Sequence, residues 1–339
     1  MLISICVIAK NEADSIGVLI RNMATQTVFC QSDDFEFVVI CNGCEDNTAE
    51  VAAGELEKAF VGTNVRSHIH DTPISGKARS WNLAVHEVLD PTADIIVFMD
   101  SDIQLKDNEV IADLISKLLA NANTSAISGW PVKDAALKKH KSIIDRFSLQ
   151  VSSQTPAPNS INGSLYVGRA GDFQKIWLPV PTAGEDGFLS AMIHTQGFTE
   201  PPMLDRIQRA DRPTHYYETH TILGFVRHER RITVATTING WIFERLWADD
   251  HSSHAGKLIK HWNENDPLWV SKLVSTKVVG RSWALPPRLL IWRLYNLRGV
   301  SFSTFCKRVP YSIAATMLNI WPAILANKAI KNEDVANIW

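Results

Sequence analysis

Two carboxylates follow a short apolar run in the first third of the chain. Residues 95–99 are Ile, Ile, Val, Phe and Met, and Asp100 and Asp102 come directly after them. The run predicts a buried strand that ends where the acids begin. Mg²⁺ and Mn²⁺ prefer oxygen ligands and often bind one or two carboxylates together with substrate phosphates. The pair therefore indicates a metal–diphosphate site, although it could also form a solvated turn or a helix cap.

A second acidic pair lies in the stretch Gly-Glu-Asp-Gly. Glu185 and Asp186 precede an expected helix at 188–194. Acidic side chains at the start of a helix complement its dipole, which is a purely structural explanation. The functional explanation is general-base catalysis, in which a positioned carboxylate takes the proton of an attacking hydroxyl.

The elements that must position these acids alternate between strands and helices. The apolar patterns predict strands at 2–8, 35–40, 65–70 and 95–99, and helices at 14–25, 48–60, 78–89 and 110–119. Such alternation, with continuous apolar strands, predicts an α/β fold with a mostly parallel sheet covered by helices. Ligands of such sheets bind beyond the carboxyl ends of the strands, where Asp100 and Asp102 are expected.

The pattern is more mixed beyond residue 120. Strands are predicted at 126–132 and 164–167, and a loop rich in Ser, Pro and Asn at 152–162. From about residue 256 onward the chain is expected to be helical and is rich in Trp.

Five stretches together resemble the inverting GT-A glycosyltransferases of family 2. They are ISICVIAKNEADSI, VVICNGCEDNT, GKARSWNLA, IIVFMDSDIQL and GEDGFLSAMI, and they occur in the family's order between residues 3 and 193. Each stretch alone is a weak signal, whereas their order and spacing are specific. The resemblance implies a GT-A fold, which is Rossmann-like, and a nucleotide-sugar donor bound across the loops that follow the first strands.

The resemblance also implies roles for individual residues. Asp186 would be the base, Glu185 would orient or bind the acceptor, and Asp100 and Asp102 would hold Mg²⁺ or Mn²⁺ on the diphosphate. The donor would contact residues of the first three loops, which are Ala9, Asn11, Glu12, Asn42, Asp46, Gly76, Lys77 and Asn82.

One position departs from the family's pattern. The family often has paired Asp before the Gly of the second loop, where this chain has Cys41 and Asn42. Asn can still hydrogen-bond to a base edge, but the departure leaves the base of the donor open. Cys41 and Cys44 could suggest zinc or redox chemistry, but without a second Cys pair they are better explained as two thiols at a strand end.

A basic stretch, Arg227-His228-Glu229-Arg230-Arg231, is the candidate for neutralising the leaving diphosphate. It resembles the basic signature that follows the acidic pair in processive and lipid-directed relatives, without their usual Gln and Trp. Arg227 and Arg231 are therefore candidate donor contacts and His228 a candidate metal ligand, although a lone His is more often simply packed or solvent-facing. Trp130 could stack on a sugar or belong to the core.

The C-terminal part of the chain is basic. Between residues 281 and 330 there are seven Lys or Arg and no Asp or Glu. In residues 283–308, Arg288, Arg293 and Arg298 alternate with Leu, Ile and Trp, which is typical of a helix in a membrane interface. A helix that packs on the catalytic domain with its Arg outward would show the same pattern.

Composition sets the remaining limits. The chain has 339 residues and a net charge of −2, which gives no signal for nucleic acid. Its five cysteines do not form a disulfide framework, and its N-terminus is typical of a strand rather than of a signal peptide. We therefore expect a cytoplasmic protein, peripheral at the inner face of the cytoplasmic membrane if the tail binds lipid.

These observations predict a metal-dependent inverting glycosyltransferase that moves a sugar from a UDP- or GDP-sugar to a hydroxyl of a glycan or a lipid. The catalytic domain would span residues 1–250, with a nucleotide-sugar half at 1–120 and an acceptor half at 121–250, and a helical extension would span 251–339. Two alternatives stay open. A nucleotidyltransferase usually has a Gly-rich basic loop after the first strand, which AKNEA lacks, and a non-catalytic nucleotide-sugar or membrane-surface binding protein would need no base.

Overall fold

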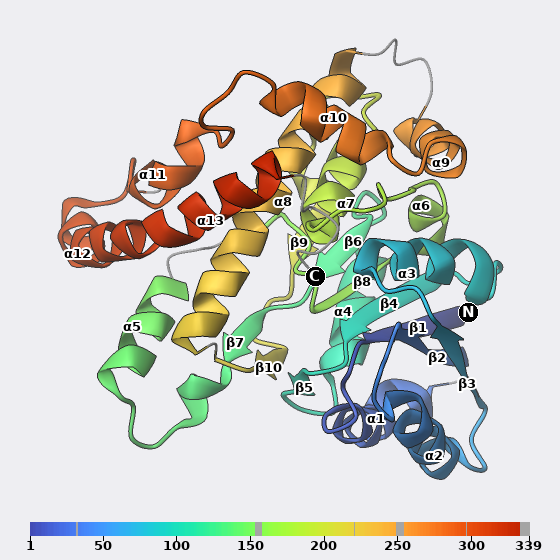
Figure 1. Ribbon diagram of the computed structural model, residues 1–339. Helices are drawn as coiled ribbons and strands as arrows, with labels where there is room; N and C mark the ends of the chain where they lie inside the picture. Colours follow the sequence, from blue (N-terminus) through green and yellow to red (C-terminus); the bar gives the residue numbers. More distant parts are fainter. Residues whose placement is uncertain (32, 153–157, 220, 249–253, 296, 333–339) are drawn as a thin grey trace.

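The computed structural model describes residues 1–31, 33–152, 158–219, 221–248, 254–295 and 297–332 (Figure 1). A seven-stranded sheet in the order β3-β2-β1-β4-β8-β6-β9 forms its centre. Strands β1, β2, β3 and β4 are parallel to one another, whereas β8 runs antiparallel to both of its neighbours, β4 and β6. The strands are β1 (Leu2–Ala9), β2 (Asp34–Asn42), β3 (Val65–Thr72), β4 (Ile95–Asp100), β6 (Ala126–Ser128), β8 (Leu165–Arg169) and β9 (Ile207–Arg209).

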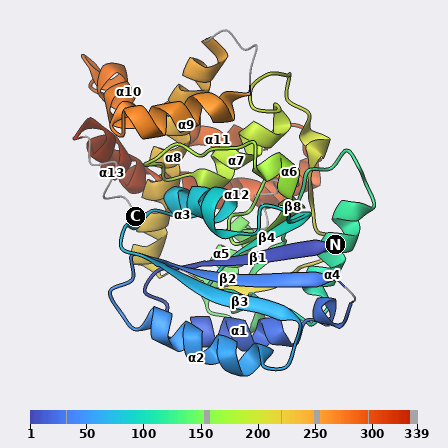
Figure 2. The same ribbon diagram turned by 90° about the vertical axis from the view of Figure 1, so that its right-hand side faces the viewer.

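Helices cover both faces of this sheet because its central strands are apolar on both sides. In β1, Ile3, Ile5 and Val7 point into one core cluster, and Cys6 and Ile8 point into the other. The first cluster is closed by α1 (Ile16–Ala24), α2 (Thr48–Phe60) and α4 (Val110–Leu119). The second is closed chiefly by α3 (Lys77–Leu83), α7 (Glu185–His194) and α8 (Ile222–Ala248). Figure 2 shows α1 and α2 on one side of the strands and α3 on the other.

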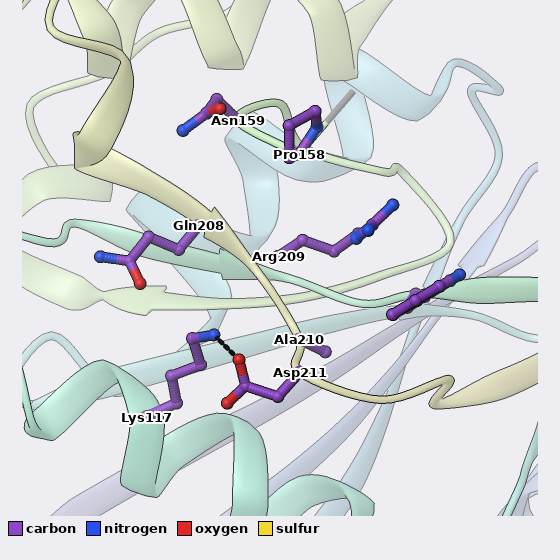
Figure 3. A pocket seen from close by; sticks show the side chains of 8 residues that line it. Lys117, Pro158, Asn159, Gln208, Arg209, Ala210 and Asp211 are labelled. Carbon is purple, nitrogen blue, oxygen red and sulfur yellow. Dashed lines mark hydrogen bonds and ion pairs between the residues drawn. The ribbon is translucent and has the colours of Figure 1, made fainter. Parts of the chain in front are cut away.

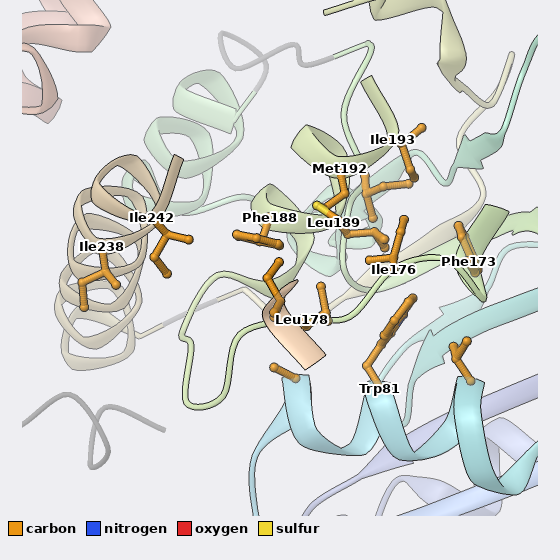
Figure 4. Close-up of a cluster of buried hydrophobic side chains, with 14 of the residues drawn as sticks. Trp81, Phe173, Ile176, Leu178, Phe188, Leu189, Met192, Ile193, Ile238 and Ile242 are labelled. Carbon is orange, nitrogen blue, oxygen red and sulfur yellow. The ribbon is translucent and has the colours of Figure 1, made fainter. Parts of the chain in front are cut away.

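Aromatic side chains fill the second core cluster (Figure 4). Trp81 of α3 is 1% exposed, and its ring stacks on Phe98 of β4 at a centroid distance of 5.7 Å. Leu178, Phe188 and Ile238 continue the cluster toward α7 and α8. The helix that follows the third strand is thereby fixed against both halves of the chain.

A small second sheet lies beside the first. Its order is β5-β10-β7, from β5 (Gln104–Leu105), β10 (His215–Tyr217) and β7 (Pro131–Lys133). Two further helices lie in the middle of the sequence. They are α5 (Ile143–Ser152), which comes after β7, and α6 (Ala170–Phe173), which directly follows β8.

The C-terminal part is helical, as predicted. It contains α9 (Ala255–Asn265), α10 (Trp269–Val278), α11 (Pro287–Tyr295), α12 (Phe302–Leu318) and α13 (Ile320–Lys331). Helices α10 and α13 pack on α8, and α12 contacts α5 and α11. In Figure 1, α11, α12 and α13 lie at the far side of α8 from the N-terminal strands. By length and composition, residues Phe302–Lys331 are the one stretch of the described chain that could cross a membrane.

The mostly parallel sheet and the alternation of the first 120 residues confirm the sequence prediction, with α2 and α4 at the predicted bounds. Two details differ, and one prediction lies partly outside the described residues. The predicted strand 126–132 is two strands in different sheets, because the chain turns at Gly129 and Trp130. The predicted helix 78–89 ends in a π-helical turn at Ala84–Val88. Part of the predicted loop 152–162, residues 153–157, lies outside the described residues. The proposed division at residue 250 stays a prediction.

Candidate active site

The site lies where the parallel strands end. β1, β2 and β4 all finish at this edge, so the loops that follow them come together there. Because β8 is antiparallel, its first residues lie beside the last residues of β4, and the backbone N–H of Asp100 donates to the carbonyl oxygen of Ser164 at 2.9 Å. This pairing brings residues 162–164, from the second half of the chain, to the end of the Asp100 strand.

Lys77 joins the two acidic pairs. Its Nζ lies 2.6 Å from Asp100 Oδ1 and 3.3 Å from Glu185 Oε1. It also donates to the carbonyl oxygen of Gly163 at 3.1 Å. The side chains of Lys77, Asp100 and Glu185 are only 23%, 28% and 12% exposed. One ammonium group therefore connects the donor-side strand, the β8 loop and the helix that carries the predicted base.

The pKa shifts follow from this crowding of charges. Burial alone would lower the pKa of Lys77, but Asp100 and Glu185 raise it above its ordinary value, so the ammonium stays charged. The pKa of Asp100 is raised by burial, and Lys77 offsets this only in part because Asp102 and Glu185 act in the opposite direction. The cluster holds more negative than positive charge and is suited to a further cation.

Asp186 stands in the first turn of α7, beside Glu185. Burial and the neighbouring Glu185 raise the pKa of Asp186 to about 6, against the smaller opposing effects of Lys77 and Arg231. One oxygen, Oδ1, accepts the backbone N–H of Gly187 at 2.7 Å. A carboxyl with a pKa near the working pH can both take up and release a proton, as a general base requires.

Helix α8 fixes the start of α7. Asn239 of α8 donates from Nδ2 to the carbonyl oxygen of Gly184 at 2.8 Å, and its Oδ1 accepts the hydroxyl of Thr182 at 3.3 Å. A Cβ at Gly184 would lie 2.8 Å from the Cβ of Ala235, so only glycine permits this close approach. The acidic pair is thus held by a helix whose role the sequence did not reveal.

The loops after β1 and β2 are tied to each other. Asn11 has a positive φ of 54°, and its Oδ1 accepts the backbone N–H of Glu45 at 2.8 Å. Asp46 accepts the backbone N–H groups of Thr48 at 3.1 Å and Ala13 at 3.3 Å. The predicted donor contacts Asn11 and Asp46 therefore lie together, and Ala9 belongs to the same junction through its carbonyl oxygen, which accepts from Cys44 Sγ at 3.5 Å.

Two predicted donor contacts are occupied by internal hydrogen bonds. Asn42 is buried, and its Oδ1 accepts the N–H of Gly76 at 2.7 Å and the hydroxyl of Ser80 at 3.0 Å. Asn82 is also buried, and its carboxamide makes a two-way bridge to the backbone of Leu178, at 2.9 Å in both directions. Asn42 thus holds Gly76, whose φ of 140° opens α3, and Asn82 holds α3 against the core.

The candidate metal ligands meet only in part. Asp102 is exposed, and the pKa of Glu12 is raised by burial and by the charges of Asp102 and Asp100, so these three acids gather at one edge. Carboxylate oxygens are ligands that suit Mg²⁺ or Mn²⁺. Among the described residues, no three His, Cys, Asp or Glu form a metal-binding group. His228 is therefore not brought to Asp100 and Asp102, because it lies on α8, apart from the strand end.

The basic stretch 227–231 lies on helix α8 and faces several directions. Arg231 is exposed and lies close enough to Asp186 to lower its pKa. Arg227 is exposed, with no donor-side contact in the described chain. Glu229 points away from the site and is buried, with Oε1 3.0 Å from Arg293 Nη2 of α11 and Oε2 2.9 Å from Asn319 Nδ2. Of Arg227, Glu229 and Arg231, only Arg231 is shown to act on the acidic pair.

Two further residues border the site, and sequence reasoning missed one of them, His215. A Cβ at Gly163 would lie 3.4 Å from Glu185 Oε1 and 3.5 Å from Lys77 Nζ, which is ordinary contact distance, so residue 163 borders both charged groups. His215 of β10 is buried and contacts the Ser164 hydroxyl through Nε2 at 2.7 Å, and burial lowers its pKa to about 3. Gly163 lies between the loop predicted at 152–162 and the strand predicted at 164–167, whereas nothing in the sequence around His215 singled it out.

A separate cavity of about 350 Å³ lies at the β9 edge of the sheet (Figure 3). Trp130 and Arg209 are among its lining residues, and the Arg209 guanidinium lies 4.0 Å from the centre of the Trp130 ring. Lys117 and Asp211 pair across another wall. Arginine thus covers one face of Trp130, and none of the predicted donor or base residues lines this cavity.

Known proteins share part of this sequence and this fold. Residues 4–163 match the glycosyl transferase family 2 profile, while a search of curated proteins found no match. A mannosyltransferase from Pyrobaculum calidifontis, solved with GDP-Man and Mn²⁺, is 16% identical with a TM-score of 0.55, and the alignment covers 98% of this chain and 87% of that one. This likeness supports the fold.

Two further structures are more distant. Glucosyl-3-phosphoglycerate synthase from Mycobacterium tuberculosis, solved with Mg²⁺ and uridine-diphosphate, is 15% identical with a TM-score of 0.45, covering 74% of this chain and 80% of that one. Mannosyl-3-phosphoglycerate synthase from Rubrobacter xylanophilus is 14% identical with a TM-score of 0.47, covering 70% and 73%. The chain thus shares the fold of that mannosyltransferase, and its residues 4–163 match the glycosyl transferase family 2 profile.

Proposed function

We propose that the chain moves a sugar, with inversion, from a UDP- or GDP-sugar to a hydroxyl of a glycan or a lipid, in a divalent-metal-dependent reaction. The observation that carries the proposal is the single polar cluster in which Lys77 joins Asp100 to Glu185, next to Asp186. A diphosphate bound at the Asp100 end and a hydroxyl bound at the Asp186 end would meet across a few ångströms, which is the arrangement that direct displacement needs.

In the proposed reaction, Asp186 accepts the proton of the acceptor hydroxyl. The hydroxyl oxygen forms a bond to the anomeric carbon while the bond from that carbon to the phosphate oxygen breaks, and the electron pair leaves with the nucleoside diphosphate. Asp186 Oδ1 already accepts the N–H of Gly187, so Oδ2 is the oxygen that takes the proton. Attack from the side opposite to the leaving group inverts the anomeric centre.

Positive charge must balance the leaving diphosphate. Asp100 and Asp102 are the residues that would hold Mg²⁺ or Mn²⁺, which would supply that charge when bound. The mannosyltransferase that shares this fold was solved with GDP-Man and Mn²⁺, which supports this assignment. Lys77, with its charge kept by Asp100 and Glu185, and Arg231 are basic groups whose charges act on Asp186, and we propose that they help to balance the diphosphate. We place the reaction in the cytoplasm, at the inner membrane face if the acceptor is lipid-borne.

The test replaces the base and leaves the donor site intact. We expect Asp186→Asn to lower turnover by about 10²–10⁴-fold and to leave the affinity for the nucleotide sugar, measured with Mn²⁺ by calorimetry, within about twofold. Asp205→Asn, at an exposed acid outside the site, is the matched control and should leave both quantities unchanged. Undiminished turnover of Asp186→Asn would remove this residue from the mechanism. A chain that binds donor with no turnover in any variant would be a binding protein instead.

A further inference from the structure

We propose that the outward face of α12 and α13 docks on the surface of an anionic lipid bilayer, with both helices lying in the plane of the interface. This inference rests on no step of the transfer reaction. The contact surface overlaps residues 283–308, whose sequence pattern first suggested a membrane contact, only at 302–308, and it continues along the rest of α12 and along α13.

Large apolar side chains form a stripe on this face. Their spacing of three, four or eight residues, which is close to whole helical turns, places them on one side of the helices. Several are far more exposed than apolar residues in a helix normally are, with Phe302 at 81%, Met317 at 66% and Trp321 at 59%. We call this set the tail stripe: Phe302, Phe305, Ile313, Met317, Trp321 and Ile324, all exposed.

The opposite face of the same helices packs on the protein through small and polar side chains. In α12 the buried residues are Ser312 and Ala315, and in α13 they include Ala323 and Ala326. Hydrogen bonds then fix the helices, because Asn319 donates to Glu229 of α8 at 2.9 Å and Asn327 accepts the N–H of Ala284 at 2.7 Å. The tail stripe therefore cannot turn inward without breaking these contacts.

The charges around the tail stripe favour an anionic partner. Residues 281–330 contain no Asp or Glu. The exposed basic residues nearest in sequence to the stripe are Arg298, Lys307, Lys328 and Lys331. Basic side chains beside an exposed apolar helix face are what anionic lipid headgroups attract.

These charges argue against a second copy of the chain as the partner. A two-fold symmetric contact would place the same basic patch opposite itself. No acid of this segment could compensate for that repulsion, since residues 281–330 contain none. The aromatic rings of the stripe, Phe302, Phe305 and Trp321, are also typical of the headgroup region of a bilayer.

The helices are expected to lie on the bilayer rather than to cross it. Phe302–Lys331 is long and apolar enough for a span, but Lys307, Arg308 and Pro310 interrupt its first half. The bonds to Glu229 and Ala284 also hold its inner face on the rest of the protein. An in-plane position leaves all of these contacts in place.

Vesicle flotation tests the proposal on the full chain. We expect binding to vesicles of phosphatidylcholine with phosphatidylglycerol, weaker binding to phosphatidylcholine alone, and a loss of binding when salt is raised. The variant Phe302→Ser/Met317→Ser/Trp321→Ser should bind at least about tenfold more weakly, because each change removes apolar area from the interface. The matched control is Val61→Ser/Leu223→Ser/Val279→Ser, which changes three equally exposed apolar residues elsewhere and should bind as the parent does.

The charge contribution has its own pair of variants. Lys307→Glu/Lys328→Glu should lower binding to the anionic vesicles and leave the weak binding to neutral ones unchanged. Lys139→Glu/Lys257→Glu changes two exposed lysines outside the tail and should have no such effect. Trp321→Phe keeps the apolar surface, and should retain binding while reducing the fluorescence quenching by brominated lipid that the parent shows.

Two results would overturn the proposal. One is flotation that the serine triple variant leaves unchanged, or that the parent never shows. The other is a dimer of the parent in light scattering that the triple variant converts to monomer, which would assign the stripe to a second copy. Asp186→Asn should float like the parent, so failure of docking and failure of the proposed reaction are separately visible.

Discussion

The two ends of the chain place their apolar side chains in opposite directions. In the sheet, Ile3, Ile5 and Val7 of β1 and Trp81 of α3 are almost completely buried. In α12 and α13, most of the large apolar residues face outward, whereas the buried face consists mainly of alanines, with Ser312, Pro322 and Ile330. Both regions are rich in Trp, Ile and Phe, so apolar content alone does not say which is a core.

Backbone pairing decides the difference. Central strands are covered by helices on both faces, so every side chain of β1 beyond the first residue is buried. A helix on the surface buries only the face that contacts its neighbour, and here that face carries small residues. The sheet end of the molecule is therefore stabilised by its apolar groups, whereas the tail keeps them available for another surface.

The largest expected effect compares one residue type in the two regions. Trp81→Ala should lower the free energy of unfolding by about 4 kcal/mol, since it empties a packed site between α3 and β4. Trp321→Ala should change it by less than about 0.5 kcal/mol, because most of that side chain is in solvent. Urea unfolding of both variants measures the contrast. Equal losses of unfolding free energy would mean that Trp321 is packed in a core, as Trp81 is.

The second-largest effect is expected at Glu229 of α8, which accepts hydrogen bonds from Arg293 and Asn319 in the tail. Glu229→Ala removes the partner of both Arg293 and Asn319 and leaves a buried guanidinium without its counter-ion, which should cost about 3 kcal/mol. Hydrogen exchange should then rise in α11–α13 and stay unchanged in β1 and β4. Glu244→Ala is the control, because this acid of the same helix pairs with Lys277 while 65% exposed, and its loss should cost less than about 0.5 kcal/mol.

A smaller effect is expected at the sheet edge. Lys77→Met leaves Asp100 and Glu185 without their shared cation and should destabilise the protein by about 2 kcal/mol at neutral pH. The loss should shrink at pH 5, because the raised pKa of Asp100 favours uptake of a proton by that carboxyl. Lys117→Met, at a lysine of similar exposure whose partner Asp211 is 84% exposed, should have almost no effect. Thermal unfolding at the two pH values gives the comparison.

The smallest expected effect is a gain in folding stability. The pKa of Asp186 is about 6 in the folded chain, against an ordinary value of 3.8, so its ionisation opposes folding. Asp186→Asn should therefore stabilise the protein by up to about 2 kcal/mol above pH 6, with the gain vanishing below pH 4. The turnover of the parent should rise with pH through about 6, as the carboxyl loses its proton. A gain that does not change with pH would assign the effect to packing.

Local patterns predicted most of the sheet region. The β-branched runs of β1, β2 and β4 are long enough to identify strands, and the acids that follow them mark the strand ends. Helix α8 was missed as an element because its 27 residues mix basic, acidic and apolar types without a clear periodicity. The split between β6 and β7 depends on a turn whose strands join different sheets, which no local signal specifies.

The site was predicted by residue type more than by arrangement. Lys77, Asp100, Glu185 and Asp186 do come together, but the contact of Lys77 with both acids depends on strand pairing far along the chain. Asn42 and Asn82 show the opposite case. Their place in the motif suggested ligand contacts, whereas burial gives their amide groups backbone partners. Sequence cannot distinguish these two uses of an asparagine, because both require the same side chain near the same loop.

Because β8 runs antiparallel to β4, two distant parts of the chain share the candidate site. The residues just before β8, Gly163 and Ser164, lie at the end of β4. Neither part alone would hold all the residues that we propose for the reaction. A polypeptide cut near residue 120 would have to reassemble its two fragments, strand against strand, before the proposed transfer could take place.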